Sequence, residues 1–477
     1  MIFTIISDEL MKFALITYIL HHKHKGKYYS YEPYIREMNI WLKFTTGFIC
    51  LAPKKNDIPK ATETAYFRSP SEFYEIPQTS LISIKESLRS IFYFPLVTIK
   101  IFNVMKNADH IHLRCPGNVG LLSCFVQIFF PHKPKTAKYA GNWDPKAKQP
   151  WSYKLQKRIL SNTFLTRNMT VLIYGKWPNQ SKNIHPFFTA SFSENEIKQI
   201  EKNLNSPYKF LFVGNLVPGK QPQFAIRLVE ALKYKNISAE LHVYGDGILK
   251  NELKIHAENK DYIHLHGNQP IEVLKQAYKD SHFLILASKS EGWPKAVAEA
   301  MFFGCIPIVT PLSCVPWMLK YGSRGILIPE VKVVRGQRTE GRGEVVSGEY
   351  KEDSRDVLKG VGRGRRSEDR GEGERGLLGT FQKNRQFECF PNAAEAVSEN
   401  VSRTGFSETP AYRQGRLEVT SGKMNEDQDV LGETVDKIIK LLQDPVEMKR
   451  MSMEAQEWSQ EYTLEKFEEA IKDILKR

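Results

Sequence analysis

The chain has 477 residues, a length that exceeds one hydrophobic core and predicts two or three domains. Hydrophobic residues make up 41% and charged residues 26% of it, as is usual for a soluble protein. No apolar run reaches the roughly 18–20 residues that span a bilayer. The N-terminus lacks the basic segment of a signal peptide, and the six cysteines show no metal-type spacing. We therefore expect a cytoplasmic protein that starts at Met1 or at Met11.

The net charge of +14 predicts anionic partners, namely sugar nucleotides, an anionic membrane surface or nucleic acid. Residues 331–430 contain 18 basic and 18 acidic groups and are therefore neutral. The whole positive excess lies in the rest of the chain, mostly as lysine.

From Lys12 to about Glu330, strand signals alternate with amphipathic helices. The first series has predicted strands at 12–20, 109–114, 136–139 and 171–174, and a helix at about 118–130. The second series has strands at 208–213, 239–244, 262–265, 283–287 and 306–309, and helices at 222–234, 249–258, 271–280 and from Pro294. This alternation predicts an α/β fold with helix-covered parallel sheets. The break near 190–207 predicts two Rossmann-like domains that face each other.

Residues 331–426 have a different composition, rich in Arg, Gly and Glu and poor in apolar side chains. Such a segment cannot bury enough surface to offset its ordering entropy, so we predict a disordered insertion. Helical periodicity returns at Val430 and ends with a helix at about 464–475. The expected domains are 1–193, 194–330 together with 427–460, and a C-terminal helix, 461–477, that crosses back to the first domain.

Two carboxylates, Glu291 and Glu299, lie eight positions apart after the strand at 283–287. Pro294 is suited to the first position of a helix, which places Glu291 in the preceding loop and Glu299 inside the helix. That helix is apolar on nearly all sides and reads as buried. A buried carboxylate needs a hydrogen-bond donor, so we expect a partner for Glu299 such as a ligand hydroxyl.

Two glycine-bearing turns follow predicted strands. Gly214 and Gly219 precede Lys220 at the start of a helix, where backbone N–H groups and the ammonium would attract a phosphate. Gly245 and Gly247 flank Asp246 in the second turn. Taken alone, the first turn is equally compatible with a purely structural role, and for the second turn a structural role is the favoured interpretation.

Together these segments resemble the donor half of the family 4 glycosyltransferases, which are retaining enzymes of the GT-B fold. The resemblance covers about 208–330 and resumes at about 430–477. The family's Ser-x-x-Glu-Gly-x-Pro motif with a second Glu corresponds to Ser288, Glu291, Gly292, Pro294 and Glu299. Its glycine and lysine loop corresponds to Gly214-Asn215-Leu216 through Lys220, its Gly-Asp-Gly turn to 245–247, and a later element to 304–310.

The resemblance implies a role for each of these residues. Glu291 and the backbone amides of Gly292 and Trp293 would hold the donor sugar, and Glu299 the nucleotide ribose. Lys220 would neutralise the leaving diphosphate. The enzyme would need neither a metal nor a cofactor, since the nucleotide-sugar, UDP- or GDP-linked, is its substrate. The chain departs from the family at Asn215, where the family has an arginine that binds the diphosphate.

The N-terminal half matches the family only in its layout. The family's glycine loop after the first strand is replaced by His21–Tyr28, with Gly26 as its one candidate glycine. Histidines 21, 22 and 24 lack metal-ligand spacing, so we interpret this segment as a solvated basic loop or an acceptor contact. The residues expected to face the acceptor are His22, Gly26, Arg114, Asn118 and Asn142. Residues 121–130 with the basic 132–135 form either a core helix or a membrane-docking element.

The sequence therefore predicts a metal-independent hexosyltransferase that acts with retention on a saccharide or lipid-linked acceptor. Surface polysaccharide or lipopolysaccharide synthesis, at the inner face of the cell membrane, would suit its basic N-terminal half. A sugar-nucleotide epimerase or a phosphorylase of the same fold is the alternative. A nucleic-acid-binding protein that acts through the Arg/Gly segment is a more distant one.

Overall fold

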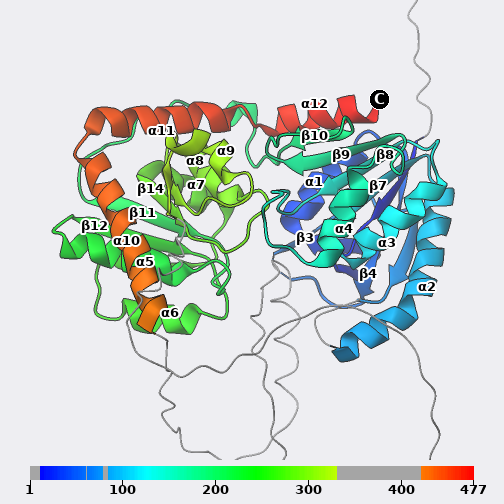
Figure 1. The fold of residues 1–477 in the computed structure, drawn as a ribbon, viewed down its shortest axis with the longest axis horizontal. Coiled ribbons are helices and arrows are strands. Elements are labelled where there is room, and N and C mark those ends of the chain that lie inside the picture. Colours follow the sequence, from blue (N-terminus) through cyan, green and yellow to red (C-terminus); the bar gives the residue numbers. More distant parts are fainter. Residues whose placement is uncertain (1–10, 61, 79–83, 330–420, 477) are drawn as a thin grey trace, which may run out of the picture. The chain divides into compact units, whose positions relative to one another are not determined.

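The computed structural model describes residues 11–60, 62–78, 84–329 and 421–476. Side chains are described in the same ranges except at 84–91 and 421–427. Of the predicted disordered insertion, residues 331–420 lie outside the described residues, and 421–426 belong to a helix. Figure 1 shows two sheets, one in blue to green and one in green to yellow, each with helices packed beside its strands.

The N-terminal sheet has a parallel spine in the order β10-β9-β8-β7-β1-β4-β6. Its strands are β1 (Lys12–Ile16), β4 (Gly47–Lys55), β6 (Glu72–Ile76), β7 (His110–Cys115), β8 (Lys135–Tyr139), β9 (Met169–Tyr174) and β10 (Ile184–Phe187). The helices of this half are α1 (Glu32–Leu42), α2 (Ile84–Lys106), α3 (Asn118–Val126) with the 3-10 turn η1 (Gln127–Phe129), and α4 (Trp151–Leu160). A second 3-10 turn, η2 (Glu194–Glu196), follows the sheet.

The C-terminal sheet has six parallel strands in the order β13-β12-β11-β14-β15-β16. They are β11 (Tyr208–Val213), β12 (Ala239–Tyr244), β13 (Ile263–Gly267), β14 (Phe283–Leu286), β15 (Ile306–Val309) and β16 (Ile326–Leu327). The helices between them are α5 (Pro222–Tyr234), α6 (Lys250–Ala257), α7 (Ile271–Asp280), α8 (Lys295–Phe302), α9 (Val315–Met318) and the turn η3 (Lys320–Gly322).

Both sheets have the doubly wound strand order of Rossmann-type folds, in which the direction of winding reverses beside the first strand. The reversal lies between β11 and β14 in the C-terminal sheet and between β1 and β7 in the N-terminal sheet. Buried parallel strands read as continuous apolar runs, and all four residues of β14 are buried. The predicted α/β fold with two Rossmann-like halves is confirmed.

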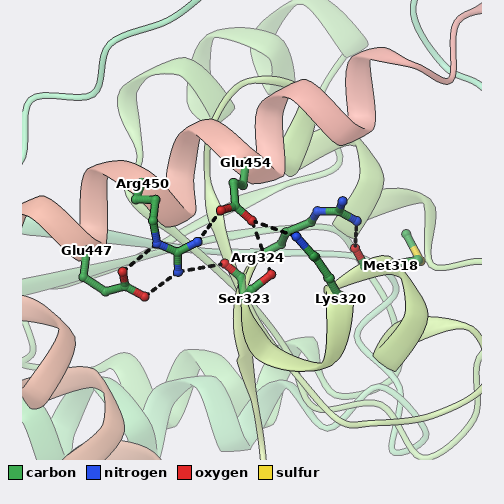
Figure 2. A network of polar contacts seen from close by, with 7 residues as sticks. All are labelled: Met318, Lys320, Ser323, Arg324, Glu447, Arg450 and Glu454. Carbon is green, nitrogen blue, oxygen red and sulfur yellow. Dashed lines mark hydrogen bonds and ion pairs between the residues drawn. The ribbon is translucent and has the colours of Figure 1, made fainter.

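Three helices follow at the C-terminus: α10 (Ser421–Leu442), α11 (Pro445–Gln460) and α12 (Leu464–Leu475). Figure 2 shows how α11 is joined to the segment that precedes β16. Arg450 donates to Glu447 at 2.6 Å and also to Glu454, while the Ser323 hydroxyl donates to Glu454 at 3.3 Å. The two bonds of Arg450 lie within α11, and the Ser323–Glu454 bond joins the helix to the segment before β16.

The last helix contacts the core of the N-terminal half. Phe467 and Ile471 of α12 belong to the same buried cluster as Phe13 and Trp41. Lys43 adds an ion pair of 2.6 Å with Glu468. The domain boundaries expected from sequence stay predictions.

The segment after β1 differs from the solvated basic loop expected at His21–Tyr28. It forms a hairpin of β2 (His21–His24) and β3 (Lys27–Tyr31), and β5 (Glu63–Ala65) extends it. Both His21 and His22 are buried. The expectation failed because distant residues supply the partners: the ring of His21 hydrogen-bonds to the Tyr66 hydroxyl at 2.8 Å.

Burial of His21 makes the stability of the fold sensitive to acid. Burial and, to a smaller extent, neighbouring His22 together lower the pKa of His21 from 6.5 to about 4, although a hydrogen bond with the Ile19 carbonyl opposes the shift. Below pH 6.5 the His21 ring binds a proton in the unfolded chain but stays neutral in the folded chain. The free energy of unfolding therefore falls as the pH drops from 6.5 toward 4. Between pH 7 and pH 5 this one histidine should cost about 2 kcal/mol of unfolding free energy.

The change to test is His21→Gln, which keeps hydrogen-bonding capacity and removes the titration. Urea unfolding gives the free energy of unfolding at pH 7 and at pH 5. We expect the loss of this free energy from pH 7 to pH 5 to be about 2 kcal/mol smaller in the variant than in the wild type. His256→Gln, at an exposed position on α6, is the control and should leave the difference unchanged. A variant with the wild-type pH dependence would contradict a neutral buried His21.

Candidate active site

The two loops that the sequence singled out leave adjacent strands at the reversal point of the C-terminal sheet. One follows β11 and carries Lys220, and the other follows β14 and carries Glu291. The Lys220 ammonium contacts a Glu291 carboxylate oxygen at 2.6 Å. The backbone N–H of Lys289 donates to the Gly219 carbonyl at 2.8 Å, which ties the loops together. Ligands bind at such reversal points in open α/β sheets.

Local backbone geometry places Lys220 at the start of α5. Gln221 adopts a left-handed conformation with φ of 49°, and Pro222 begins the helix. The first N–H groups of a helix and its dipole attract anions. The ammonium of Lys220 and the N-terminus of α5 thus form one positive region, which the Glu291 carboxylate offsets. The Glu291 side chain is only 9% exposed, whereas that of Lys220 is 27% exposed.

The glycine turns after β11 and β12 lie directly against each other. Gly214 N–H donates to the Tyr244 carbonyl at 3.0 Å, and Leu216 N–H donates to the Asp246 carbonyl at 2.9 Å. A Cβ on Gly245 would lie 1.9 Å from the Gly214 carbonyl oxygen, so any side chain there would collide with backbone. Gly245 and Gly247 (where a Cβ would lie 2.5 Å from the Leu216 carbonyl oxygen) therefore have a packing role in the donor half.

The carboxylate in the second turn has its own partners. Lys250 donates to Asp246 at 2.5 Å, and the Gly247 N–H donates to it at 2.8 Å. These two hydrogen bonds lower the pKa of Asp246. Asn215, which precedes Leu216 in the facing loop, offers an amide where the family has a guanidinium.

Glu299 lies in α8, as the sequence predicts, and its hydrogen bonds come from the protein itself. The Ser191 hydroxyl donates to one carboxylate oxygen at 2.6 Å, and the Tyr278 hydroxyl donates to the other at 3.1 Å. Burial raises the pKa of Tyr278, and the Glu299 charge raises it further. A ligand hydroxyl is therefore not needed to satisfy this carboxylate. The proposed contact with a ribose stays a prediction.

The residues between the two glutamates connect the donor loop to the protein interior. Helix α8 begins at Lys295, one residue later than expected, with Pro294 at the N-cap. The indole of Trp293 is buried beside Trp458 and Tyr462 at 6.2 and 5.7 Å, so only its backbone can face a ligand. A Cβ on Gly292 would lie 3.2 Å from the Ala140 carbonyl oxygen, which leaves little room for a side chain.

Arg114 lies at the carboxyl end of β7, beside the reversal point of the N-terminal sheet. Its Nε and Nη1 atoms are shielded from solvent and have no hydrogen-bond partner among the described residues. Burial works to lower the pKa of Arg114, but the carboxylate of Glu37 and nearby tyrosines raise it above its usual value. The structure therefore holds a charged guanidinium with unused donors. The nearby helix α3 begins at Asn118, with Gly117 as an N-cap that offers no side chain.

The other residues expected on the acceptor side are partly engaged. Asn142 accepts the Asp144 N–H through Oδ1 at 2.8 Å. His22 contacts Asp57 and lies 3.3 Å from Glu63, so its ring is occupied by carboxylates of the N-terminal half. Gly26, with φ of 79°, forms the two-residue turn of the β2–β3 hairpin with Lys25. The left-handed conformation that this turn requires is enough to explain a glycine at position 26, without any contact to an acceptor.

Sequence reasoning missed a buried ion pair next to Arg114. Lys138 of β8 donates to Glu37 of α1 at 2.7 Å, and both side chains are almost fully buried. Burial lowers the pKa of Lys138 to about 8, although Glu37 opposes the shift. Lys295, the first residue of α8, is coupled electrostatically to the same Glu37 carboxylate and to Glu299. The one available signal was a second lysine in the buried strand β8.

Residues 121–135, interpreted from sequence as either a core helix or a membrane-docking element, have bonded lysines and exposed apolar side chains. Lys133 donates to the Lys106 and Ala108 carbonyls at 2.7 and 2.5 Å, and Lys135 donates to the Phe130 carbonyl at 2.5 Å, so neither ammonium is free. The apolar side chains nearby are exposed instead: Phe92, Leu96, Ile99 and Phe102 on α2, Phe125 on α3 and Phe129 on η1. Within the described ranges, no helix combines the length and apolar character needed to cross a membrane.

Comparisons with known proteins give a consistent result for the C-terminal half. The family model of glycosyl transferases group 1 matches residues 193–334. An uncharacterized glycosyltransferase of Methanocaldococcus jannaschii is 30% identical over 141 residues, which cover 28% of this chain and 32% of the relative. The matched region thus spans about a third of that relative's length.

Among solved structures, the pneumococcal O-GlcNAc transferase GtfA, in complex with UDP and GlcNAc, aligns at 13% identity and a TM-score of 0.45. The alignment covers 79% of this chain and 59% of GtfA. Sucrose-phosphate synthase from Thermosynechococcus elongatus aligns at 14% identity and a TM-score of 0.43, over 67% of this chain and 86% of that one.

The family match covers both loops of the candidate site, with Lys220 and Glu291, and agrees with the resemblance found in the sequence. The predicted GT-B fold class agrees with the two doubly wound sheets. Residues 193–334, less than half of the chain, match the model of the glycosyl transferases group 1 family.

Proposed function

We propose that the protein is a retaining glycosyltransferase that moves a hexose-type sugar from a UDP- or GDP-linked donor to a saccharide or lipid-linked acceptor. The observation that carries this proposal is the Lys220–Glu291 contact of 2.6 Å at the reversal point of a sheet within the family match. It joins one group suited to a phosphate with one suited to sugar hydroxyls.

Binding of the donor would break the Lys220–Glu291 ion pair. Its diphosphate would compete with Glu291 for the Lys220 ammonium, and the carboxylate so released would accept hydrogen bonds from the sugar. Transfer breaks the bond between the anomeric carbon and the diphosphate oxygen and forms a bond to the acceptor oxygen. The proton of the acceptor hydroxyl would pass to the leaving diphosphate, whose charge Lys220 and the N-terminus of α5 would stabilise. These groups would provide that stabilisation without a metal ion.

The acceptor would bind beside the reversal point of the N-terminal sheet. Arg114 offers unused donors there, and the N-terminus of α3 lies three residues further on. A guanidinium whose Nε and Nη1 lack hydrogen-bond partners among the described residues favours an anionic group, such as the phosphate of a lipid-linked or phosphorylated saccharide. Such an acceptor would suit surface polysaccharide or lipopolysaccharide synthesis at the inner face of the cell membrane.

Other functions have less support. A sugar-nucleotide epimerase or a phosphorylase would share the fold, and no feature of the site favours either one. We expect no nucleic-acid partner; the remote alternative rests on the Arg/Gly segment, whose residues 331–420 lie outside the described residues.

The donor site can be tested by release of nucleoside diphosphate from a panel of UDP- and GDP-sugars. Lys220→Ala and Glu291→Gln should each lower kcat by roughly 10²–10³-fold, because each removes charge stabilisation or sugar binding in the transition state. Lys235→Ala, at an exposed position after α5, is the control and should retain full activity. Equal turnover in all three variants, or no release from any donor by the wild type, would contradict the proposal.

The acceptor site calls for a different readout. Arg114→Lys keeps the charge but loses the guanidinium fork, so it should raise the acceptor KM by roughly ten- to a hundredfold. Donor hydrolysis without acceptor should be unchanged, which separates this variant from a damaged donor site. Arg158→Lys, exposed on α4, is the matched control. An unaltered acceptor KM would remove Arg114 from the binding site.

The exposed apolar side chains of α2, α3 and η1 support peripheral contact with a membrane. Co-sedimentation with lipid vesicles should be weakened by Phe125→Ser together with Phe129→Ser, because both rings are exposed at the end of α3. Phe164→Ser, an exposed ring after α4, provides the comparison. Vesicle binding that persists in the double variant would argue against this surface.

A further inference from the structure

Four polar side chains gather on one face of the outermost strands of the C-terminal sheet. Glu240 and His242 alternate along β12, and His264 and His266 alternate along the edge strand β13. Residues two apart on a strand point to the same face. The register places His242 directly beside His264. None of these residues takes part in the proposed transfer reaction.

The spacing of their atoms fits coordination of a metal ion. One ligand atom each from Glu240, His242 and His264 lies within 4.8 Å of the other two. The Glu240 carboxylate lies 3.6 Å from Nε2 of His242. Two ligands of a tetrahedral zinc ion are about 3.3 Å apart, given bonds of about 2.0–2.1 Å. Small side-chain adjustments would therefore bring the three atoms to bonding distance of one ion.

The ring of His242 is already oriented as a ligand. Its Nδ1 atom is 3.0 Å from Nε2 of His266. With the proton on Nδ1, His242 donates this hydrogen bond and keeps the lone pair of Nε2, which lies 3.6 Å from the Glu240 carboxylate. The ring of His264 is stacked beside that of His242, with centroids 4.7 Å apart. The Nε2 atom of His242 is buried and has no hydrogen-bond partner in the part of the chain that the structure describes. A buried polar atom without a partner calls for an explanation.

His266 supplies the support that metal-binding histidines usually have. Such a histidine donates its second ring N–H to a neighbouring group, which fixes the tautomer and the orientation of the ring. The ring of His266 is in turn stacked on Tyr244, with centroids 4.4 Å apart. The four-residue arrangement thus contains three candidate ligands and one residue that positions the second of them.

We propose that Glu240, His242 and His264 bind one divalent transition-metal ion of the zinc class, with His266 holding the His242 ring. Imidazole nitrogen and carboxylate oxygen are ligands that Zn²⁺ accepts. The side chains of Glu240 and His242 are 33% and 20% exposed, so water can complete the coordination. The ion would join the edge strand β13 to β12, three residues before the turn at Gly245. This site is independent of the proposed transfer activity.

The test is isothermal titration of the full chain, freed of metal by a chelator, with Zn²⁺. We expect one saturable site in the wild type. Removing a ligand in His264→Ala or Glu240→Gln should weaken binding at least about a hundredfold, and His266→Gln about 10–100-fold through the orientation of His242. His256→Ala, a histidine exposed on the neighbouring helix α6, should bind like the wild type.

Absorption of bound Co²⁺ provides a second readout, because the visible bands of the ion report ligand geometry. The bands should appear in the wild type and in His256→Ala and disappear in His264→Ala. Glu240→Gln changes a partly exposed side chain to one of equal size, so it keeps the test valid if a histidine variant fails to fold. A wild type without saturable Zn²⁺ binding would overturn the proposal. So would binding as tight in the ligand variants as in the wild type.

Discussion

The reversal of strand order between β11 and β14 is the constraint on which the candidate site depends. Two neighbouring strands send their following helices in different directions, so the loops between them are not closed off by a crossover. Lys220 and Glu291, 71 positions apart in the chain, meet there at 2.6 Å. The N-terminal sheet repeats the arrangement between β1 and β7, and Arg114 lies at that point. Strand order alone therefore determines where both halves can bind a ligand.

Residues that belong to the candidate site and also pack into the protein distinguish the C-terminal half from a plain Rossmann domain. The Glu291 loop carries a candidate sugar ligand, and its next residues, Gly292 and Trp293, pack into the protein. Glu299 is held by Ser191 and Tyr278, which come from the segment before β11 and from α7. A change in the packing of these neighbours would therefore shift the position of the candidate site residues, because they are close in the chain.

Sequence reasoning worked best where local pattern decides the structure. The bounds of β11, α5, β12, α7, β15 and α12 were predicted to the residue, because apolar period, proline and glycine mark their ends. It failed at His21–Tyr28, where Tyr66 and Asp57 supply partners that no local pattern contains. The Ser191–Glu299 and Lys138–Glu37 contacts were invisible for the same reason, since 108 and 101 positions separate their residues. The histidines of β12 and β13 meet only through strand register.

The close approach of the turns after β11 and β12 also bears on how donor preference could be redesigned. Backbone contact at Gly214, Gly245 and Gly247 fixes the spacing of the two turns without any side chain. A library that varies these glycines would yield mainly misfolded protein. Asn215 and Asp246 lie between them on the same rigid frame, so new side chains can be exchanged there while the backbone stays in place. If the donor binds as proposed, directed evolution of nucleotide selectivity would start at these two positions.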